Sequence, residues 1–211
     1  MALEQPDLGI LRKAQRGDER AFSIIVRAYE RPIYNYVLRL VGDRALAEDL
    51  TQEVFLRIYQ GLPGFSLRSR FTTWMFQVTK NRVLDELRAL ERRPRSVVNI
   101  DDIAPLESLD APFERAETID ALWRAVEALN VDLKMALLLR DIVGFSYTEI
   151  ADSLEITLAT VKWRIYKARE EVQAALLREG VGVAILPGTQ QDSLAGQRCL
   201  LDRHIRPALM H

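Results

Sequence analysis

The sequence predicts an all-α protein of two small helical domains joined by a flexible linker. Apolar residues recur at helical spacing over most of the chain, and no stretch alternates as a β-strand would. Residues that cap helices stand where the helices would begin, and glycines stand where several would end. An acidic stretch with two prolines and no apolar period separates the two helical parts. We place the domains at 7–95 and 116–178, the acidic linker at 96–115, and a C-terminal extension at 179–211.

Four helices are expected in the first domain. Three aspartates would cap the first three helices by accepting hydrogen bonds from backbone N–H groups: Asp7, Asp18 and Asp43. Pro32 is expected to interrupt or kink the second helix. A Gly-Leu-Pro-Gly run at 61–64 would break the third, and a loop at 65–70 would follow. The fourth helix is expected over about 71–90, with a basic far end.

The second domain is expected to resume the helical pattern at about Ala116. Asp132 would cap its second helix, which would stop at Gly144. Ser146 and Glu149 have the spacing of a capping box, in which each side chain bonds the other residue's backbone N–H. After a turn at 155–156, Thr157 would cap a final helix running to about Leu177, so the last two helices would form a helix-turn-helix.

The final helix is expected to bury one stripe, made of Val161, Ile165, Ala168 and Val172. Thr160, Trp163 and Lys167 would then point the opposite way, with Lys162 and Tyr166 on the flank. Lysines can contact phosphates or guanine edges, and aromatic rings can pack on thymine methyl groups or the sugar backbone. Such a face suits a DNA major groove, and the alternative is an ordinary helical hairpin with a solvated basic face.

The bulk composition limits the classes of protein. Among 211 residues, 48% are hydrophobic and the formal net charge is −1, so any nucleic-acid affinity must come from local charge or from a partner. Cys199 is the single cysteine, which excludes an internal disulfide framework. The sequence shows no signal peptide and no apolar run near the ~20 residues of a membrane helix, so we expect a cytoplasmic protein.

Three motifs resemble the extracytoplasmic-function group of the sigma-70 family. Residues 47–55 read AEDLTQEVF, similar to the A-E-D-x-x-Q-E-V-F of region 2.2. Residues 71–81 resemble the F-x-x-W-L-x-x-I-A-x-N run of regions 2.3 and 2.4. Residues 146–169 resemble region 4.2, whose T-V-K-S-R-x-x-R-A-R ending reads TVKWRIYKAR here. The resemblance covers about 7–178 and implies a sigma factor that directs RNA polymerase to promoters and helps to open the DNA.

The resemblance also implies partners for particular residues. The region 2.2 helix would dock on the core RNA polymerase, where arginines could meet Asp49, Gln52 and Glu53; without the resemblance these three would be a solvated face. The loop and the following helix would bind the −10 element through Phe65, Arg68, Arg70, Lys80, Asn81, Arg82 and Arg88. Trp74 is expected to be core rather than a stacking platform, because its spacing matches Val78. The loop at 65–70 is more basic than is usual in the family.

In the second domain, the −35 element would be bound through Thr160, Lys162, Trp163, Arg164, Tyr166 and Lys167. Trp163 replaces a small residue of the family, and Glu155 stands where the family often has glycine. The linker either threads toward the polymerase channel or is a plain tether. The family also implies an anti-sigma factor as partner. In the extension 179–211, Cys199 and His204 do not make a zinc site, and a regulatory contact is a hypothesis.

Two other classes of protein remain as alternatives. A helix-turn-helix repressor or activator with no polymerase role would bind a palindromic site as a dimer, but it leaves the motifs at 47–55 and 71–81 without a purpose. An enzyme would need a catalytic or phosphate-binding signature, and none stands out; both histidines lie in the extension. We therefore expect a non-catalytic protein with no cofactor and no metal.

Overall fold

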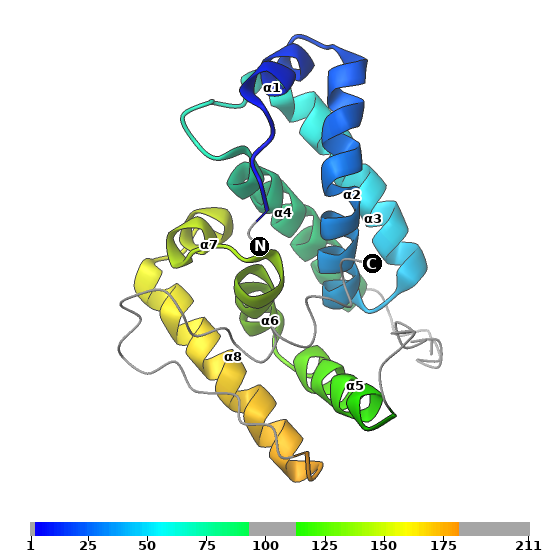
Figure 1. Ribbon diagram of the computed structural model, residues 1–211, viewed down its shortest axis with the longest axis vertical. Coiled ribbons are helices and arrows are strands. Elements are labelled where there is room, and N and C mark those ends of the chain that lie inside the picture. The colour runs from blue at the N-terminus through cyan, green and yellow to red at the C-terminus, as the bar shows by residue number, and fades with distance from the viewer. Residues whose placement is uncertain (1–2, 93–112, 182–211) are drawn as a thin grey trace. The chain divides into compact units, whose positions relative to one another are not determined.

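The computed structural model describes residues 3–92 and 113–181, and every regular element in these ranges is a helix (Figure 1). The all-α prediction is therefore confirmed for the described residues. The described residues divide into two units, and each unit is described by itself. The first holds α1–α4 together with Asp152–Glu155 at the end of α7, and the second holds the other residues of α5–α8. The predicted linker, apart from 113–115, and the extension beyond 181 lie outside the described residues.

The first unit has four α-helices in the predicted order. They are α1 (Leu8–Gln15), α2 (Glu19–Val41), α3 (Arg44–Gly61) and α4 (Phe71–Arg92), with a short 3₁₀ turn, η1 (Leu62–Gly64), after α3. The three aspartate caps are confirmed: the carboxylate of Asp7 accepts from Gly9 N at 2.8 Å, that of Asp18 from Ala21 N at 3.0 Å, and that of Asp43 from Leu46 N at 2.8 Å.

The helix α2 runs through Pro32, so an interruption there is wrong, while the kink stays a prediction. Pro32 lacks the N–H that would bond the carbonyl one turn earlier. The neighbouring turns are nevertheless fixed by packing, since Tyr29, Ile33 and Tyr36 are all buried. Tertiary burial of these side chains outweighs the lost hydrogen bond. The helix ends at Gly42, whose φ of 74° is the left-handed conformation that glycine adopts without steric cost.

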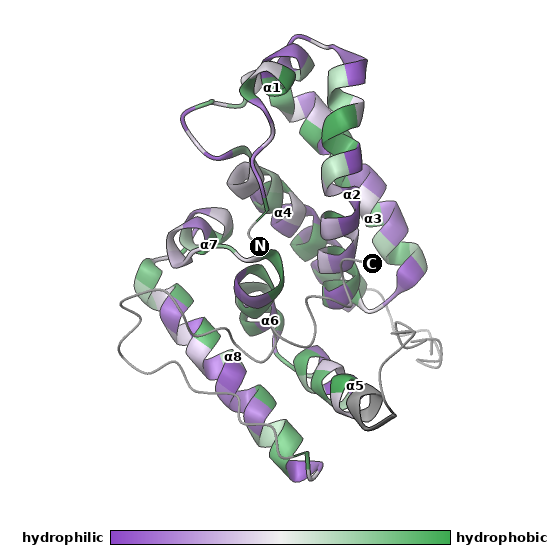
Figure 2. Cartoon of the chain, viewed as in Figure 1, coloured by the Kyte–Doolittle hydropathy of each residue, from purple (hydrophilic) through white to green (hydrophobic). Residues whose placement is uncertain are grey.

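The core of the first unit is built around α2, which packs against α1, α3 and α4. Ile33 and Val37 of α2 are completely buried. The ring of Tyr36 meets that of Phe76 in α4 edge-to-face, with 5.2 Å between centroids. Figure 2 shows hydrophilic residues along the same helices, so each helix has a buried and a polar side. The polar sides remain available for partners.

The second unit holds α5 (Phe113–Glu127), α6 (Val131–Leu138), α7 (Tyr147–Leu154) and α8 (Leu158–Arg178). A π-helical turn, η2 (Leu139–Val143), extends α6. Both α5 and α6 pack against α8, so α8 is the helix around which they are arranged.

Two details of this unit differ from the sequence prediction. The first helix begins at Phe113, three residues before the expected Ala116. The cap of α6 is Asn130 rather than Asp132: the Asn130 side chain accepts from Asp132 N at 2.9 Å. Both residue types are strong N-caps, so their order in the sequence does not show which one leaves the helical conformation. Gly144, with a φ of 84°, ends the helical run formed by α6 and η2, as expected.

The helix-turn-helix is confirmed in its local hydrogen bonds. Glu149 N donates to Ser146 Oγ at 3.2 Å, and Ser146 N donates to Glu149 Oε2 at 2.8 Å, which completes the capping box. Thr157 caps α8 by accepting from Thr160 N at 3.2 Å. Between the helices, Glu155 has a φ of 58°. This left-handed conformation explains why glycine suits the position in the family, since a Cβ there is sterically strained.

We expect Glu155→Gly to be more stable than Glu155→Ala by about 1 kcal/mol, because only glycine relieves the left-handed strain. Both substitutions remove the same carboxylate, so their difference isolates the backbone. Urea unfolding of the two full-length variants measures it. Equal unfolding free energies would show that the turn is unstrained.

Candidate functional site

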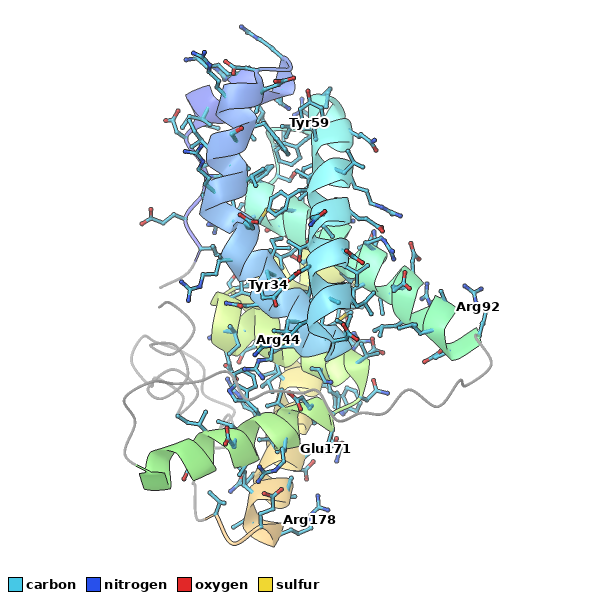
Figure 3. The ribbon with its side chains drawn as sticks, turned by 90° about the vertical axis from the view of Figure 1, so that its right-hand side faces the viewer. Tyr34, Arg44, Tyr59, Arg92, Glu171 and Arg178 are labelled. Atoms are coloured by element: carbon cyan, nitrogen blue, oxygen red, sulfur yellow. The ribbon has the colours of Figure 1, made fainter. Side chains whose placement is uncertain are left out.

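One exposed surface lies on the outer side of α3. Asp49, Gln52 and Glu53 are exposed at helical spacing, and on the opposite side of the helix Leu50 and Val54 are 1% and 0% exposed. Figure 3 shows α3 between Arg44 at its start and Tyr59 near its end, with side chains projecting from the helix. Leu56 continues the exposed side and is 56% exposed. We call Asp49, Gln52, Glu53 and Leu56 the α3 face.

Glu53 already has a partner within the unit. Its carboxylate accepts a hydrogen bond from Arg82 Nε of α4, and Arg82 Nη2 also bonds Glu86 at 2.7 Å. The bond to Arg82 lowers the pKa of Glu53, and the bonds to Glu53 and Glu86 raise that of Arg82. Arg82 is only 11% exposed. In this structure Arg82, which the sequence suggested for DNA, joins α3 to α4.

The loop between η1 and α4 presents its basic residues to solvent. Ser66, Arg68 and Arg70 are exposed, and Ser69 N and Oγ both donate to Ser66 O at 3.2 Å. No acidic residue occurs in 65–70, so the loop carries a local positive charge. This arrangement gives the loop two cationic side chains on a closed turn, which suits phosphate contacts.

Phe65 differs from the loop residues that follow it. Its side chain is 7% exposed, and its ring lies 4.9 Å from that of Trp74 and 5.8 Å from that of Phe71. The expected DNA contact of Phe65 is therefore not available in this structure, where the ring supports the base of the loop. Trp74 is half-buried in the same aromatic group. Burial of these rings holds the loop against α4.

The second half of α4 carries the remaining candidates for the −10 element. Asn81 and Arg88 are exposed on the same side of the helix as Asp85, which lies 4.0 Å from Arg88. Lys80 precedes Asn81 on α4 but is buried, with 6% of its surface exposed, so this structure does not present the Lys80 that the sequence suggested for DNA. The structure thus presents Asn81 and Arg88 on one helical side, whereas Arg82 points to α3.

The outer side of α8 holds the candidates for the −35 element. Trp163 is 59% and Tyr166 49% exposed, and Lys162 is exposed beside them. The buried stripe is as predicted: Val161, Ile165, Ala168 and Val172 are at most 2% exposed. An indole and a phenol beside a lysine form an amphipathic surface that suits the edge of a base pair and its phosphate.

Three other candidates on α8 are engaged within the unit. Arg164 is 17% exposed and bonds Asp132 of α6 at 3.1 Å, so its guanidinium faces the fold. Lys167 pairs with Glu170 at 2.8 Å, and Thr160 shares a hydrogen bond with Thr157. Surface pairs such as Lys167–Glu170 are weak and exchange readily for a phosphate. Arg164 is the candidate that the fold holds most firmly.

Each unit matches a known protein family region. Residues 25–93 match Sigma-70 region 2, and residues 119–172 match Sigma-70, region 4, which together exceed half of the chain. The chain belongs to the extracytoplasmic-function group of the sigma-70 family. The two matched spans contain α3, α4, α7 and the part of α8 up to residue 172, and therefore every surface described above.

Named relatives extend the match over both units. The sigma factor is 33% identical to the RNA polymerase sigma-H factor of Pseudomonas aeruginosa over 186 residues, which is 83% of this chain and 96% of that protein. It is 32% identical to the ECF RNA polymerase sigma-E factor of Escherichia coli over 184 residues, covering 82% and 95%. The relatives therefore match this sigma factor along nearly their whole length.

Solved structures show the same fold. CnrH, in complex with the cytosolic domain of CnrY, superposes with a TM-score of 0.60 at 21% identity, covering 81% of this chain and 96% of that one. The sigma factor RpoE of Bartonella quintana, in complex with the anti-sigma factor NepR, gives 0.60 at 22% identity, covering 74% and 96%. These likenesses establish the fold of the sigma factor and carry no residue roles.

Residues 3–92 and 113–181 contain neither a helix that could span a membrane nor a cluster of metal ligands. No helix there has the length and apolar character to cross a membrane. Within the same residues, no three side chains of His, Cys, Asp or Glu come together as metal ligands. Cys199 and His204 lie outside the described residues.

The sequence analysis missed an ion pair that positions α8. Arg169 Nη2 bonds Asp141 Oδ1 at 2.8 Å, and the two side chains are 13% and 5% exposed. The pair joins the π-helical turn η2 to the middle of α8. The partners stand 28 positions apart in the sequence, so no local pattern indicates the pair. This ion pair fixes the helix whose outer side carries Trp163.

We expect Arg169→Met to destabilise the sigma factor by about 3 kcal/mol, because it leaves the Asp141 carboxylate buried without its cation. Arg178→Met, at the exposed end of the same helix, should change stability by less than about 0.5 kcal/mol. Adding Asp141→Leu to Arg169→Met should recover much of the loss, since no buried charge remains. Urea unfolding measures all three, and a small effect of Arg169→Met alone would contradict the structural role.

Proposed function

We propose that this sigma factor binds core RNA polymerase through the α3 face and delivers it to promoters. The support is that the AEDLTQEVF motif lies on the exposed side of a helix whose other side is fully buried. The α3 face combines two carboxylates, an amide and an exposed leucine, which suits a positively charged partner with an apolar centre. Because the negative charge of Glu53 is partly neutralised by its ion pair with Arg82, Asp49 would supply most of the electrostatic attraction to the polymerase.

We propose that the loop 65–70 and the exposed side of α4 bind the −10 element. Arg68 and Arg70 would contact the backbone of the opened strand, while Asn81 and Arg88 would contact the adjoining DNA. Lys80 is buried at 6% exposure and is not among the side chains that this side of α4 presents. Phe65 and Arg82 contribute indirectly, by supporting the loop and by joining α4 to α3. Strand opening is then favoured by contacts made only with the single strand.

We propose that α8 reads the −35 element in the major groove. Trp163 and Tyr166 would contact base edges, and Lys162, Lys167 and Thr160 would contact the backbone. Arg164 holds α8 to α6 and sets the docking angle of the helix. Because the net charge is −1, the polymerase supplies most of the affinity for DNA, and the protein alone binds DNA weakly.

We also propose that an anti-sigma factor controls this protein and that it acts in the cytoplasm without catalysing a reaction. The support is that two sigma factors of the same fold were solved as complexes with such partners or with a cytosolic domain. Run-off transcription with core polymerase on a promoter library tests the whole proposal. No initiation from any duplex promoter would reject it.

Asp49→Lys should weaken binding to core polymerase by about tenfold or more, because it places a cation against the basic partner surface. Glu30→Lys, an exposed substitution on α2 with the same change in net charge, serves as the control and should bind normally. Fluorescence anisotropy of labelled protein titrated with core polymerase measures both. Unchanged binding of Asp49→Lys would remove the α3 face from the proposal.

Substitutions on α8 should separate backbone contacts from base readout. Lys162→Ala should weaken −35 binding of the holoenzyme equally across sequences and reduce the salt slope by about 1. Trp163→Ala should instead change which −35 sequences are preferred. Lys13→Ala, exposed on α1, is the control. Selection from a randomised −35 library at several salt concentrations measures these effects, and identical preferences for Trp163→Ala would show that the indole reads no base.

A further inference from the structure

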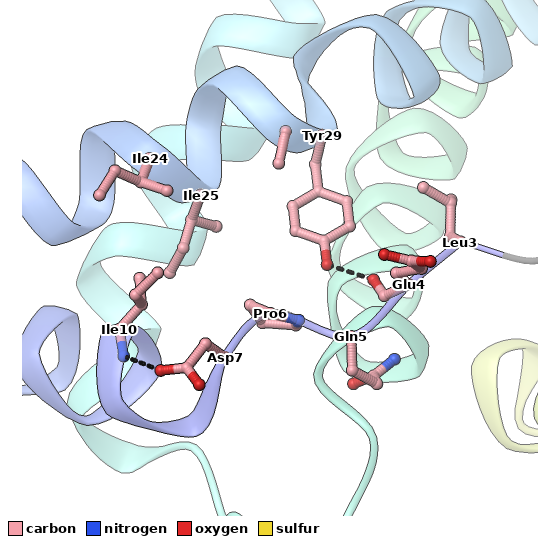
Figure 4. A pocket seen from close by; sticks show the side chains of 10 residues that line it. Leu3, Glu4, Gln5, Pro6, Asp7, Ile10, Ile24, Ile25 and Tyr29 are labelled. Atoms are coloured by element: carbon pink, nitrogen blue, oxygen red, sulfur yellow. Dashed lines mark hydrogen bonds between the residues drawn. The ribbon is translucent and has the colours of Figure 1, made fainter.

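The chain enters the first unit through residues 3–7, which we call the N-terminal strap. The strap crosses α2 before α1 begins (Figure 4). Tyr29 of α2 donates a hydrogen bond from its hydroxyl to the carbonyl oxygen of Glu4, and Asp7 caps α1 at the far end of the strap. Burial, and secondarily Glu4, raises the pKa of Tyr29 to about 12, so the hydroxyl keeps the proton that it donates at neutral pH.

Gln5 of the strap caps the helix that follows the −10 loop. Its Oε1 accepts from Phe71 N at 2.8 Å, and its Nε2 donates to Thr72 Oγ1. The first N–H groups of a helix have no partner inside the helix and need an acceptor. Helices usually take this acceptor from the residue just before them, whereas Gln5 supplies it to α4 from 66 residues away.

Gln15, at the end of α1, holds the other end of the same loop. Its Nε2 donates to the carbonyl oxygens of Leu62 at 3.1 Å and Phe65 at 2.9 Å. The loop 65–70 therefore begins at a residue held by Gln15, and Gln5 holds Phe71, the residue that directly follows the loop. The hydrogen bonds between Ser66 and Ser69 close the turn but do not attach it to the rest of the unit.

The strap forms one wall of a cavity, so these polar contacts are part of what holds it in place. A cavity of about 350 Å³ lies beneath it, lined by apolar residues of α1 and α2 that include Ile10, Ile24 and Ile25 (Figure 4). Ile24 is 50% exposed, so the strap does not seal the cavity. Where a segment borders a cavity instead of close-packed side chains, its hydrogen bonds contribute more to fixing its position. Loss of the Gln5 contacts would therefore leave the start of α4 without a defined partner.

We propose that Gln5 and Gln15 are positioning residues that set the base preference of the −10 loop. The inference rests on the proposed role of that loop. Binding sites discriminate only when the contacting groups are held within about 0.5 Å of their productive positions. Arg68 and Arg70 would hold the strand by its backbone, so displacement of either loop end would shift the bases of that strand relative to the helix side that carries Asn81. The N-terminal segment thereby becomes part of promoter recognition without touching DNA.

The experiment measures base discrimination by the full-length holoenzyme. Wild-type protein with core polymerase first selects its preferred −10 sequence from a randomised promoter library. The holoenzyme is then titrated with single-stranded non-template oligonucleotides that carry each of the four bases at each −10 position. Gln5→Met keeps the length of the side chain and removes its acceptor. We expect it to reduce the discrimination ratio by at least about threefold, with polymerase binding unchanged.

Two further variants separate positioning from stability. Gln5→Glu keeps an acceptor for Phe71 N and should retain wild-type discrimination. Glu4→Ala changes the neighbouring side chain but keeps the carbonyl that Tyr29 bonds, and it should also behave as wild type. A Gln5→Met protein that loses affinity equally for all four bases, with its ratios intact, would overturn the proposal.

Gln15→Met tests the other end of the loop independently. It should also reduce discrimination between the four bases. If Gln5→Met does not fold or does not bind polymerase, Gln15→Met is the variant that tests the proposal. Unchanged ratios for a folded Gln15→Met protein in that case overturn the proposal. If the wild-type holoenzyme itself shows no preference at any −10 position, the proposed function of the loop fails and this inference fails with it.

Discussion

Burial of one stripe on α3 and one on α8 determines what the protein shows to its partners. On α3, Leu50 and Val54 are fixed in the core, so Asp49 and Glu53 must face outward. On α8, burial of the inner stripe has the same effect on Trp163. A helix buried on one side cannot rotate without exposing apolar surface, so the functional side chains keep fixed directions without further contacts.

Short-range chemistry accounts for what could be predicted from the sequence. The caps at Asp7 and Thr157 and the capping box at Ser146 depend on atoms within three or four residues, and the stripe of α8 depends on the helical period alone. Pro32 shows the limit of such reasoning, because its local preference was overruled by side chains packed from other helices. The choice between Asn130 and Asp132 as a cap was equally beyond a local pattern.

Pairings between distant residues could not be predicted. Arg82 was a reasonable DNA candidate by charge and position, yet Glu53 of another helix holds it. Gln5 had no feature that marked it, because a glutamine that caps a remote helix looks like any surface glutamine. Phe65 was suggested for DNA by its place in the loop, but its burial depends on Trp74. In each case the deciding contact joins segments whose proximity only the fold creates.

The π-helical turn at Leu139–Val143 has a consequence for how the chain tolerates change. A π turn contains one residue more than an α turn, so each residue after it is rotated relative to a regular continuation of α6. Deleting one residue within η2 would restore regular winding and turn the following residues by about 100°. Asp141 would then no longer face Arg169, and the chain would enter α7 in a different direction. We therefore expect insertions and deletions within Leu139–Val143 to disrupt the second unit.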